Sequence, residues 1–554
     1  MSLKKPYAHL CAPLACVLFS ANLLSAAEDN EIEQLKAALA AQQKQIQALQ
    51  QAMDNEQKML ERALQTRPNL GTVASLSPMV PGPAPAPTPL TLPAPTTLPT
   101  PKPQAPSAGA SGNPCEAPPD ANAVPAYLRL GSVCVIPVGF MDLTAVWRDK
   151  NAASGIGTNF GSIPYNNTIP GKLSEFRFSP QNSRLGFRAD GDWKGTHLMA
   201  YNEFDFLGTS GTNNLGVTNG AFVPRIRLFW IDVKKDKWEF LGGQSWSLLT
   251  PNRRGESALP GDLFYSQVID VNYMAGLTWS RQPGVRVLYH PNNKVVVGLS
   301  AENPDQYIGG SGGTSPVTLP KGALGSIGGV QVDNATNTLN TPNLHPDFIL
   351  KVAFDPSAKF HAEVAGIERT FKIYNQNTNT YSTKVGGGLQ FGFNAEVVKN
   401  FRMMTTNFWS DGGGRYLFGE APDFIVRADG TVSPMKGYGT VDGFEWTLGN
   451  TLLYGYYGGI YIGRDTAIDT DGTLIGYGYR GGPNSQNRSI NEVSFGFNQT
   501  MWKNPRYGAI NIMGQYQYTM RNPWFVAVGA PKATHDNAIY MNLRYTLPGS
   551  MPNF

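Results

Sequence analysis

The 554-residue sequence has no long apolar run after residue 25, few charged residues and only four cysteines. A helix needs about 18 consecutive apolar residues to cross a bilayer, so the rest of the chain cannot cross one as a helix. Charged residues make up 16% of the chain, and the formal net charge of +4 indicates no nucleic-acid partner. If the exported chain spans a membrane, it must do so as a β-barrel.

Glycine, proline and aromatic residues are abundant instead, with 60 Gly, 42 Pro, 27 Phe and 23 Tyr. This mixture of turn formers and bulky side chains is typical of a chain with many short strands. In a membrane β-barrel, apolar lipid-facing residues alternate with lumen-facing residues, so the mean hydropathy stays near that of a soluble protein. The observed mean hydropathy of -0.25 agrees with a barrel.

The first residues have the features of a secretory signal peptide. Lys4 and Lys5 precede an apolar segment over residues 10–24, and Ser-Ala-Ala at 25–27 provides a small-residue cleavage site. Residues 1–27 are therefore predicted to be removed on export. A retained helical anchor is disfavoured because the apolar segment is short and no basic residues follow it.

Residues 28–67 contain a seven-residue apolar repeat that is typical of a coiled coil. Its two core positions are occupied in turn by Ile32, Leu35, Leu39, Gln42, Ile46, Leu49, Met53, Glu56, Leu60 and Ala63. The polar residues Gln42 and Glu56 can fix the register at a cost in stability, and this mixed core does not distinguish a dimer from a trimer. We expect a periplasmic coiled coil, with a single amphipathic helix packed on another element as the alternative.

Residues 68–114 form a proline-rich linker. Between residues 78 and 106, 12 of 29 positions are proline, which disfavours helices and sheet ladders and predicts an extended, semi-rigid spacer. Beyond it lie Cys115 and Cys134, the only cysteines of the exported chain. In an oxidising compartment they are expected to pair and to close a loop over residues 115–134, with two unpaired thiols as the alternative.

From residue 135 to residue 554, short segments of alternating apolar and polar residues are separated by Gly, Pro, Asn and Asp. Leu185 and Phe187, for example, share one face of a strand whose other face holds Arg184 and Arg188. Strands are predicted at 135–148, 183–190, 196–206, 225–234, 237–244, 272–281, 284–290, 294–303, 347–355, 359–374, 382–398, 401–411, 437–449, 451–465, 489–502, 506–520 and 537–547. Single-chain bacterial barrels have an even number of strands, so this tally of 17 must be in error by one. We predict an all-β, transmembrane antiparallel β-barrel of 16 strands, with 18 as the alternative.

The connections between the predicted strands differ greatly in length. Tight turns at 399–400 and 503–505 contrast with long, Gly- and Asn-rich loops at 303–346 and 466–488, as expected for the two rims of a membrane barrel. Aromatic clusters near strand ends, such as Phe408-Trp409, would form girdles at the membrane interfaces. The alternative is a secreted soluble β-protein in which these aromatics form ordinary core packing.

Three motifs follow one another in the first half of this region: Gly243-Gln-Ser-Trp-Ser247, Trp279-Ser-Arg-Gln-Pro283 and Glu302-Asn-Pro304. Together with the segments 182–187 and 201–206, they resemble the DcaP-like outer-membrane porins over residues 135–304. Members of that family are trimers with an N-terminal coiled coil. The resemblance implies passive diffusion of small anionic, especially carboxylate, solutes across the outer membrane of a diderm bacterium, with the N-terminal segment in the periplasm. Phosphate-selective porins are the nearest rival family.

The charges at the narrowest part of a pore determine its selectivity. Residues 243–270 hold Arg253 and Arg254 between two strands and are long enough to fold inward as a constriction loop. The other candidate pore-lining and solute-binding residues are Arg184, Arg188, Arg281 and Arg286 on the predicted lumen face of their strands, and Arg225 and Arg227, which share one face of theirs. Guanidinium groups suit carboxylate and phosphate oxygens, so these arginines are expected to form a basic lane that favours anions. The alternative is that they pair with Glu203, Asp205, Asp190 and Glu239 and stiffen the barrel wall, and both can hold at once.

No catalytic residue, cofactor or metal site is predicted, and the protein is not expected to be an enzyme. None of the six histidines lies in an arrangement like the His-x-Ser-Asn-Gly run of the outer-membrane phospholipase. The segment Gly476–Gly481 fits a dinucleotide-binding pattern but lacks the strand-then-helix context. Besides a channel, the sequence leaves open a structural anchor that tethers the outer membrane to peptidoglycan or to a periplasmic partner through the coiled coil.

Overall fold

The structure of the chain is a computed structural model. The described residues are 127–152, 155–208, 222–263, 268–269, 273–309, 317–321, 332, 344–375 and 379–550. All of them belong to the second of two compact units, Pro103–Phe554. The predicted signal peptide, coiled coil and proline-rich linker lie outside the described residues. So does Cys115; Cys134 is disulfide-bonded, and the expected pairing of the two stays a prediction.

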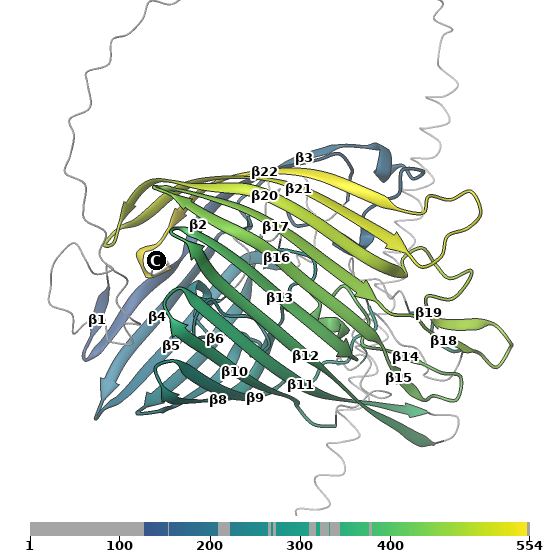
Figure 1. Ribbon diagram of the computed structural model, residues 1–554, viewed down its shortest axis with the longest axis horizontal. Coiled ribbons are helices and arrows are strands. Elements are labelled where there is room, and N and C mark those ends of the chain that lie inside the picture. Colours follow the sequence, from purple (N-terminus) through teal and green to yellow (C-terminus); the bar gives the residue numbers. More distant parts are fainter. Residues whose placement is uncertain are drawn as a thin grey trace, which may run out of the picture. The chain divides into compact units, whose positions relative to one another are not determined.

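Sixteen antiparallel strands in the described residues close into a β-barrel (Figure 1). In order around the barrel they are β2 (Val133–Arg148), β4 (Arg184–Trp193), β5 (Thr196–Gly208), β6 (Val223–Lys235), β7 (Trp238–Trp246), β8 (Arg281–Asn292), β9 (Val295–Glu302), β10 (Asp347–Ser357), β11 (Phe360–Asn375), β12 (Thr380–Val398), β13 (Phe401–Asp411), β16 (Lys436–Leu448), β17 (Thr451–Ile462), β20 (Asn487–Asn504), β21 (Gly508–Pro523) and β22 (Thr534–Thr546). The prediction of 16 strands is confirmed.

The first strand closes the barrel by pairing on both of its edges. On one edge β2 pairs with β4, with Val135 opposite Ala189, and on the other it pairs with β22, with Leu143 opposite Leu543. Two extra strands, β1 (Leu128–Leu130) and β3 (Glu175–Ser179), add to the ends of β2. Closure leaves no open edge in the ring, which is what allows a sheet to span a bilayer.

The two rims of the barrel differ as the sequence predicted. At one rim, seven hairpins between successive strands of the described ring have turns of two or three residues, at 194–195, 236–237, 293–294, 358–359, 399–400, 449–450 and 505–507. At the other rim, long connections such as 247–280 and 412–435 join the strands. Lys194 and Gly195 both have positive φ, 49° and 76°, as a tight hairpin turn between twisted strands requires. Among the described residues, no helix is both long enough and apolar enough to span a membrane.

The strands place apolar side chains outward and polar side chains inward. On β4, Leu185 and Phe187 point outward and are 41% and 55% exposed, whereas Arg184 points inward and is 4% exposed. The last strand follows the same alternation, with Leu543 exposed and Asn542 buried. This polarity is the reverse of that of a water-soluble protein and matches the outer surface of a membrane barrel.

Candidate functional site: the barrel lumen and its inward loop

The described residues of the connection between β7 and β8, 247–263, 268–269 and 273–280, fold back into the barrel. Its two arms start side by side at the wall, because Ser247 N donates a hydrogen bond to the carbonyl oxygen of Ser280 at 2.8 Å. Leu249 and Leu277, one on each arm, are fully buried. The predicted inward fold of this region is therefore present, although the loop starts and ends later than the expected 243–270. We call residues 247–280 the inward loop.

The outgoing arm of the inward loop is held by carboxylates of the barrel wall. Asn252 N donates to Glu363 Oε2 on β11 at 3.1 Å. Arg253 makes a two-point ion pair with Glu445 on β16, with distances of 2.9 and 2.6 Å from its two terminal nitrogens to the two carboxylate oxygens. Charge-assisted, two-point contacts of this kind fix orientation as well as position. The predicted pore residue Arg253 thus pins the loop to the wall.

The returning arm reaches a different part of the wall. Ile269 N donates to Gln515 Oε1 on β21 at 2.8 Å, and Ala275 N donates to Glu492 Oε2 on β20 at 2.7 Å. Because β20 and β21 are separated from β11 by several strands in the ring, the inward loop crosses the lumen from one side to the other. It therefore divides the space available to a solute.

The strand predicted over 272–281 is wrong: residues 273–280 belong to the inward loop, and Arg281 begins β8. The chain turns at Gly276, whose φ of 87° is unfavourable for other residues, and a Cβ there would lie 2.3 Å from the carbonyl oxygen of Gly459. Trp279 N donates to the carbonyl oxygen of Tyr416 in another loop at 3.1 Å, not to a neighbouring strand. The apolar residues that suggested a strand are apolar because they pack inside the lumen.

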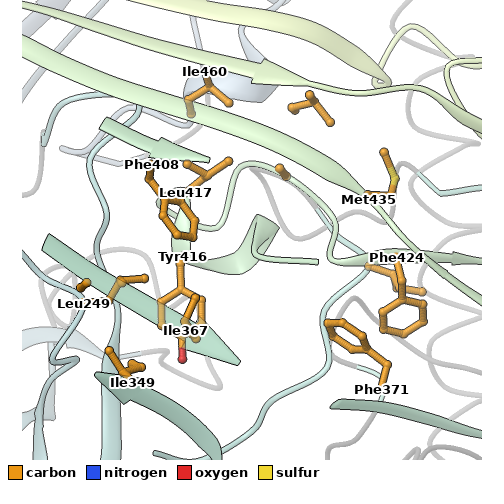
Figure 2. Packing of buried hydrophobic residues seen from close by; sticks show 14 of the residues in the cluster. Leu249, Ile349, Ile367, Phe371, Phe408, Tyr416, Leu417, Phe424, Met435 and Ile460 are labelled. Carbon is orange, nitrogen blue, oxygen red and sulfur yellow. The ribbon is translucent and has the colours of Figure 1, made fainter. Parts of the chain in front are cut away.

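A second long connection, residues 412–435, also packs inside the barrel. Figure 2 shows Tyr416 and Leu417 from this loop lying among wall residues such as Ile367 and Phe408, all of them buried in one apolar cluster. The inner wall is apolar where these loops cover it. The simple expectation of a polar lumen face therefore fails for this part of the barrel, because inward residues there meet protein and not water.

Four of the predicted arginines gather where β4 to β8 meet the inward loop. This group, the arginine cluster, consists of Arg184, Arg225, Arg227 and Arg281 with the carboxylates of Glu203 and Asp205. Arg227 contacts Glu203 Oε1 at 2.9 Å and Asp205 Oδ2 at 2.8 Å. Arg225 binds both oxygens of Asp205, at 3.0 and 2.6 Å, and Arg184 lies 3.8 Å from Glu203. The cluster therefore contains four guanidinium groups and two carboxylates, a formal excess of two positive charges.

Aromatic side chains complete the arginine cluster. The guanidinium carbons of Arg227 and Arg281 lie 5.6 and 5.4 Å from the ring centroid of Trp246, a distance at which cation–π attraction operates. The hydroxyl of Tyr273, on the inward loop, is 3.1 Å from Arg184 Nη2 and 3.3 Å from Arg227 Nη2. Nη1 of Arg281 is buried and has no hydrogen-bond partner among the described residues.

The predicted pairing of arginines with wall carboxylates is right for Asp190 and wrong for Glu239. Arg188 binds both oxygens of Asp190 at 2.7 Å. Glu239 instead contacts Lys234 at 3.3 Å and His290 at 3.0 Å. The reason is local: all three residues lie at the short-turn ends of β6, β7 and β8, which places them closer to one another than to any of the candidate arginines.

A second buried ion group includes a residue that sequence reasoning missed. Lys351 on β10 is 1% exposed and lies 3.0 Å from both Glu256 of the inward loop and Glu363. Burial raises the pKa of the Glu256 carboxyl, and the charges of Lys351 and Arg286 oppose this rise. Arg286 also donates to the carbonyl oxygen of Trp246 at 2.6 Å. The sequence feature that could have identified Lys351 is a lysine at an inward-facing position of an otherwise apolar strand.

Arg254 differs from the other candidates. It is exposed and makes no hydrogen bond or ion pair with another described residue. Its neighbour Arg253, by contrast, is held by Glu445. The structure thus brings four of the eight predicted arginines into one cluster, ties three more to wall or loop groups, and leaves Arg254 facing water.

The sequence matches no protein-family model and no curated protein. Among solved structures, the barrel is similar to the outer membrane channel DcaP of Acinetobacter baumannii, with 16% identity, a TM-score of 0.55, and coverage of 76% of this chain and 100% of that one. The barrel has a porin fold. The anion-selective porin from Comamonas acidovorans is also similar, at 10% identity over 75% of this chain and 99% of its own, but its TM-score of 0.43 is too low to argue from.

The porin fold explains the features described above as parts of one architecture. A closed barrel with an apolar exterior, unequal rims and a loop folded into the lumen is what the sequence led us to expect. At 16% identity the likeness concerns the fold alone, so membership of the DcaP-like family stays a prediction.

Proposed function

We propose that the protein is an outer-membrane porin through which small anionic, carboxylate-type solutes diffuse passively. The observation that carries this proposal is the arginine cluster, in which four guanidinium groups stand against two carboxylates beside the inward loop. A lumen partly filled by protein has a lower effective dielectric than open water, which strengthens the attraction of this excess charge for an anion. Arg281 contributes to this excess charge, because no carboxylate of the described residues forms an ion pair with it.

The remaining parts of the proposal concern location and assembly. Export by the predicted signal peptide and the apolar outer surface favour the outer membrane of a diderm bacterium, with the N-terminal segment in the periplasm. The heptad repeat and the family resemblance favour a homotrimer. The proline-rich linker would set the distance between the barrel and the coiled coil, and contact of that coiled coil with peptidoglycan or a periplasmic partner is a second, compatible role.

Arg281→Gln is expected to reduce the preference of the channel for anions. The full exported chain would be reconstituted in planar bilayers, and the reversal potential measured across a KCl gradient. We expect chloride to permeate better than potassium in the wild type, and a dicarboxylate to block the current. In Arg281→Gln both effects should weaken several-fold, because the excess positive charge of the arginine cluster falls by half.

A matched control removes one guanidinium group elsewhere. Arg506→Gln changes an exposed residue in the turn between β20 and β21 and should leave blocking by the dicarboxylate nearly unchanged. A wild-type preference for potassium would contradict the anion proposal. A barrel that inserts but conducts no ions would instead favour the structural anchor.

A further inference from the structure

Lysine residues line the short-turn rim of the barrel. Five consecutive hairpins of this rim, from β4–β5 to β12–β13, each have one exposed lysine in their two-residue turn: Lys194, Lys237, Lys294, Lys359 and Lys399. We call these five residues the turn lysines. The same five turns contain one acidic residue, Asp236, so together they carry a formal excess of four positive charges.

The ammonium groups of the turn lysines are not neutralised by protein carboxylates. None of them makes a hydrogen bond or an ion pair through Nζ with another described residue. Lys234, at an inward position of β6 near the same rim, behaves differently, because its Nζ lies 3.3 Å from Glu239. The charge of the turn lysines is therefore available to a partner outside the barrel wall.

Aromatic side chains on the outer surface lie beside the turn lysines. Trp193, Trp238 and Phe360 are each adjacent in sequence to a turn lysine and are 64%, 48% and 36% exposed. Nζ of Lys194 lies 5.0 Å from the ring centroid of Trp193, within the range of cation–π attraction. Trp238 continues an outward apolar row with Phe240, which is 51% exposed, and their ring centroids are 6.5 Å apart.

These aromatic residues indicate the depth at which the turn lysines lie. Tryptophan is enriched at the level where the hydrocarbon of a bilayer gives way to the lipid headgroups. Each turn lysine comes directly after or before the end of a strand, beyond the apolar band, and its four-carbon stem can lie along that band while the ammonium group stays in the polar layer. The turn lysines are thus placed at the height of the lipid phosphates.

We propose that the turn lysines form a binding surface for anionic phospholipids of the periplasmic leaflet. Membrane barrels of bacteria direct their short turns toward the periplasm, so the turn lysines meet that leaflet. Lysine binds phosphate as a point charge, and clusters of basic residues beside a bilayer attract anionic lipids. A zwitterionic headgroup offsets its phosphate with its own cation, whereas phosphatidylglycerol keeps a net negative charge that suits the excess on the turns. The proposal rests on the outer-membrane location and not on the solute that the channel passes.

Quenching of tryptophan fluorescence by brominated lipids tests this proposal, because Trp193 and Trp238 lie beside turn lysines. The full exported chain is folded into phosphatidylcholine vesicles that contain a fraction of either brominated phosphatidylglycerol or brominated phosphatidylcholine. We expect brominated phosphatidylglycerol to reach half-maximal quenching at a several-fold lower fraction, and this preference to shrink at high salt, which screens charges. Both leaflets have the same composition, so the orientation of the barrel does not matter. Equal quenching by the two lipids at low salt would overturn the proposal.

Two matched variants assign the lipid preference to one rim. The first replaces all five turn lysines with glutamine and should quench almost equally with the two brominated lipids. The control replaces five exposed basic residues on the long-loop side with glutamine and should keep the wild-type preference. Its positions are Lys172, Lys384, Lys436, Arg480 and Lys532. The heat-modifiable gel shift verifies that both variants are folded barrels.

The outcomes separate this proposal from the other roles of the protein. Equal loss of the preference in both variants, or an unchanged preference without the turn lysines, would contradict it. If the turn lysines were needed for sedimentation with isolated peptidoglycan but not for the lipid preference, the partner would be the cell wall and the proposal would be wrong. Reversal potentials across a KCl gradient test the anion proposal separately, so that either proposal can fail without the other.

Discussion

Replacing residues 248–279 with a two-residue Asn-Gly turn is expected to raise the single-channel conductance several-fold. The inward loop crosses the lumen from Glu363 on β11 to Glu492 on β20, so its removal widens the path for ions. The truncation is feasible because Ser247 and Ser280 are already hydrogen-bonded across the two arms at 2.8 Å, and Asn-Gly suits a tight hairpin turn. Conductance would be recorded in planar bilayers at fixed salt.

A control shortening separates loss of the obstruction from general damage to the loops. The tip of the hairpin formed by β18 (Asp465–Ile468) and β19 (Leu474–Tyr477) is exposed at residues 470–473. Replacing this tip with Asn-Gly should leave the conductance unchanged. If the inward-loop truncation yields folded barrels whose conductance equals that of the wild type, the inward loop does not limit the pore.

Arg369→Met is expected to lower the free energy of unfolding by about 3 to 5 kcal/mol, the usual effect of removing one partner from a buried ion group. Arg369, 1% exposed, lies 2.9 Å from Asp347 and 2.7 Å from Asp423, and it also donates to the carbonyl oxygens of Asp305 and Gly412. It therefore joins the wall to two long loops. Without the guanidinium group of Arg369, the buried carboxylates of Asp347 and Asp423 lose the cation with which they form ion pairs. Unfolding by guanidinium in lipid vesicles would measure the change.

The pH dependence of this variant provides a further check. Burial raises the pKa of the Asp423 carboxyl, and the charge of Arg369 opposes the rise, so the substitution should raise that pKa further. A carboxyl whose pKa is higher in the folded state than in the unfolded state gains stability as the pH falls. The stability deficit of Arg369→Met should therefore shrink on acidification.

Arg177→Met is the matched control for the same chemical change at an exposed site. Arg177 pairs with Glu175 at 2.9 Å, but its side chain is 45% exposed, and such pairs contribute at most about 1 kcal/mol. Its unfolding curve should lie close to that of the wild type. Equal losses of unfolding free energy in the two variants would mean that the burial of Arg369 does not determine the size of the loss.

Much of the barrel could be predicted from the sequence because strand alternation is a local property. The alternation of Leu185 and Phe187 with Arg184 already shows which face of the strand meets lipid. Because single-chain barrels have an even number of strands, the tally of 17 predicted strands already indicated an error. The error fell on residues 272–281, where an apolar segment buried in the lumen has the same local pattern as a buried strand. Only the positive φ of Gly276 and the hydrogen bonds of Ala275 and Trp279 to distant residues distinguish the two.

The candidate site was predictable in its residue types but not in its pairings. Arg225 and Arg227 belong with Asp205 because β5 and β6 are neighbours, which follows from chain order. The partner of Arg253, Glu445, is 192 residues away, and nothing local to either residue indicates that they meet. Glu239 was assigned to the arginines although His290 on the adjacent strand is closer.

The barrel, its two unequal rims and the arginines available to the lumen could be predicted from the sequence, because all of these depend on alternation, turn chemistry and composition within short segments. Which loops fold inward and which arginines lack a carboxylate partner became evident only from the three-dimensional structure. These depend on which strands close the ring beside one another and on contacts between residues far apart in the chain, and a local pattern does not contain that information.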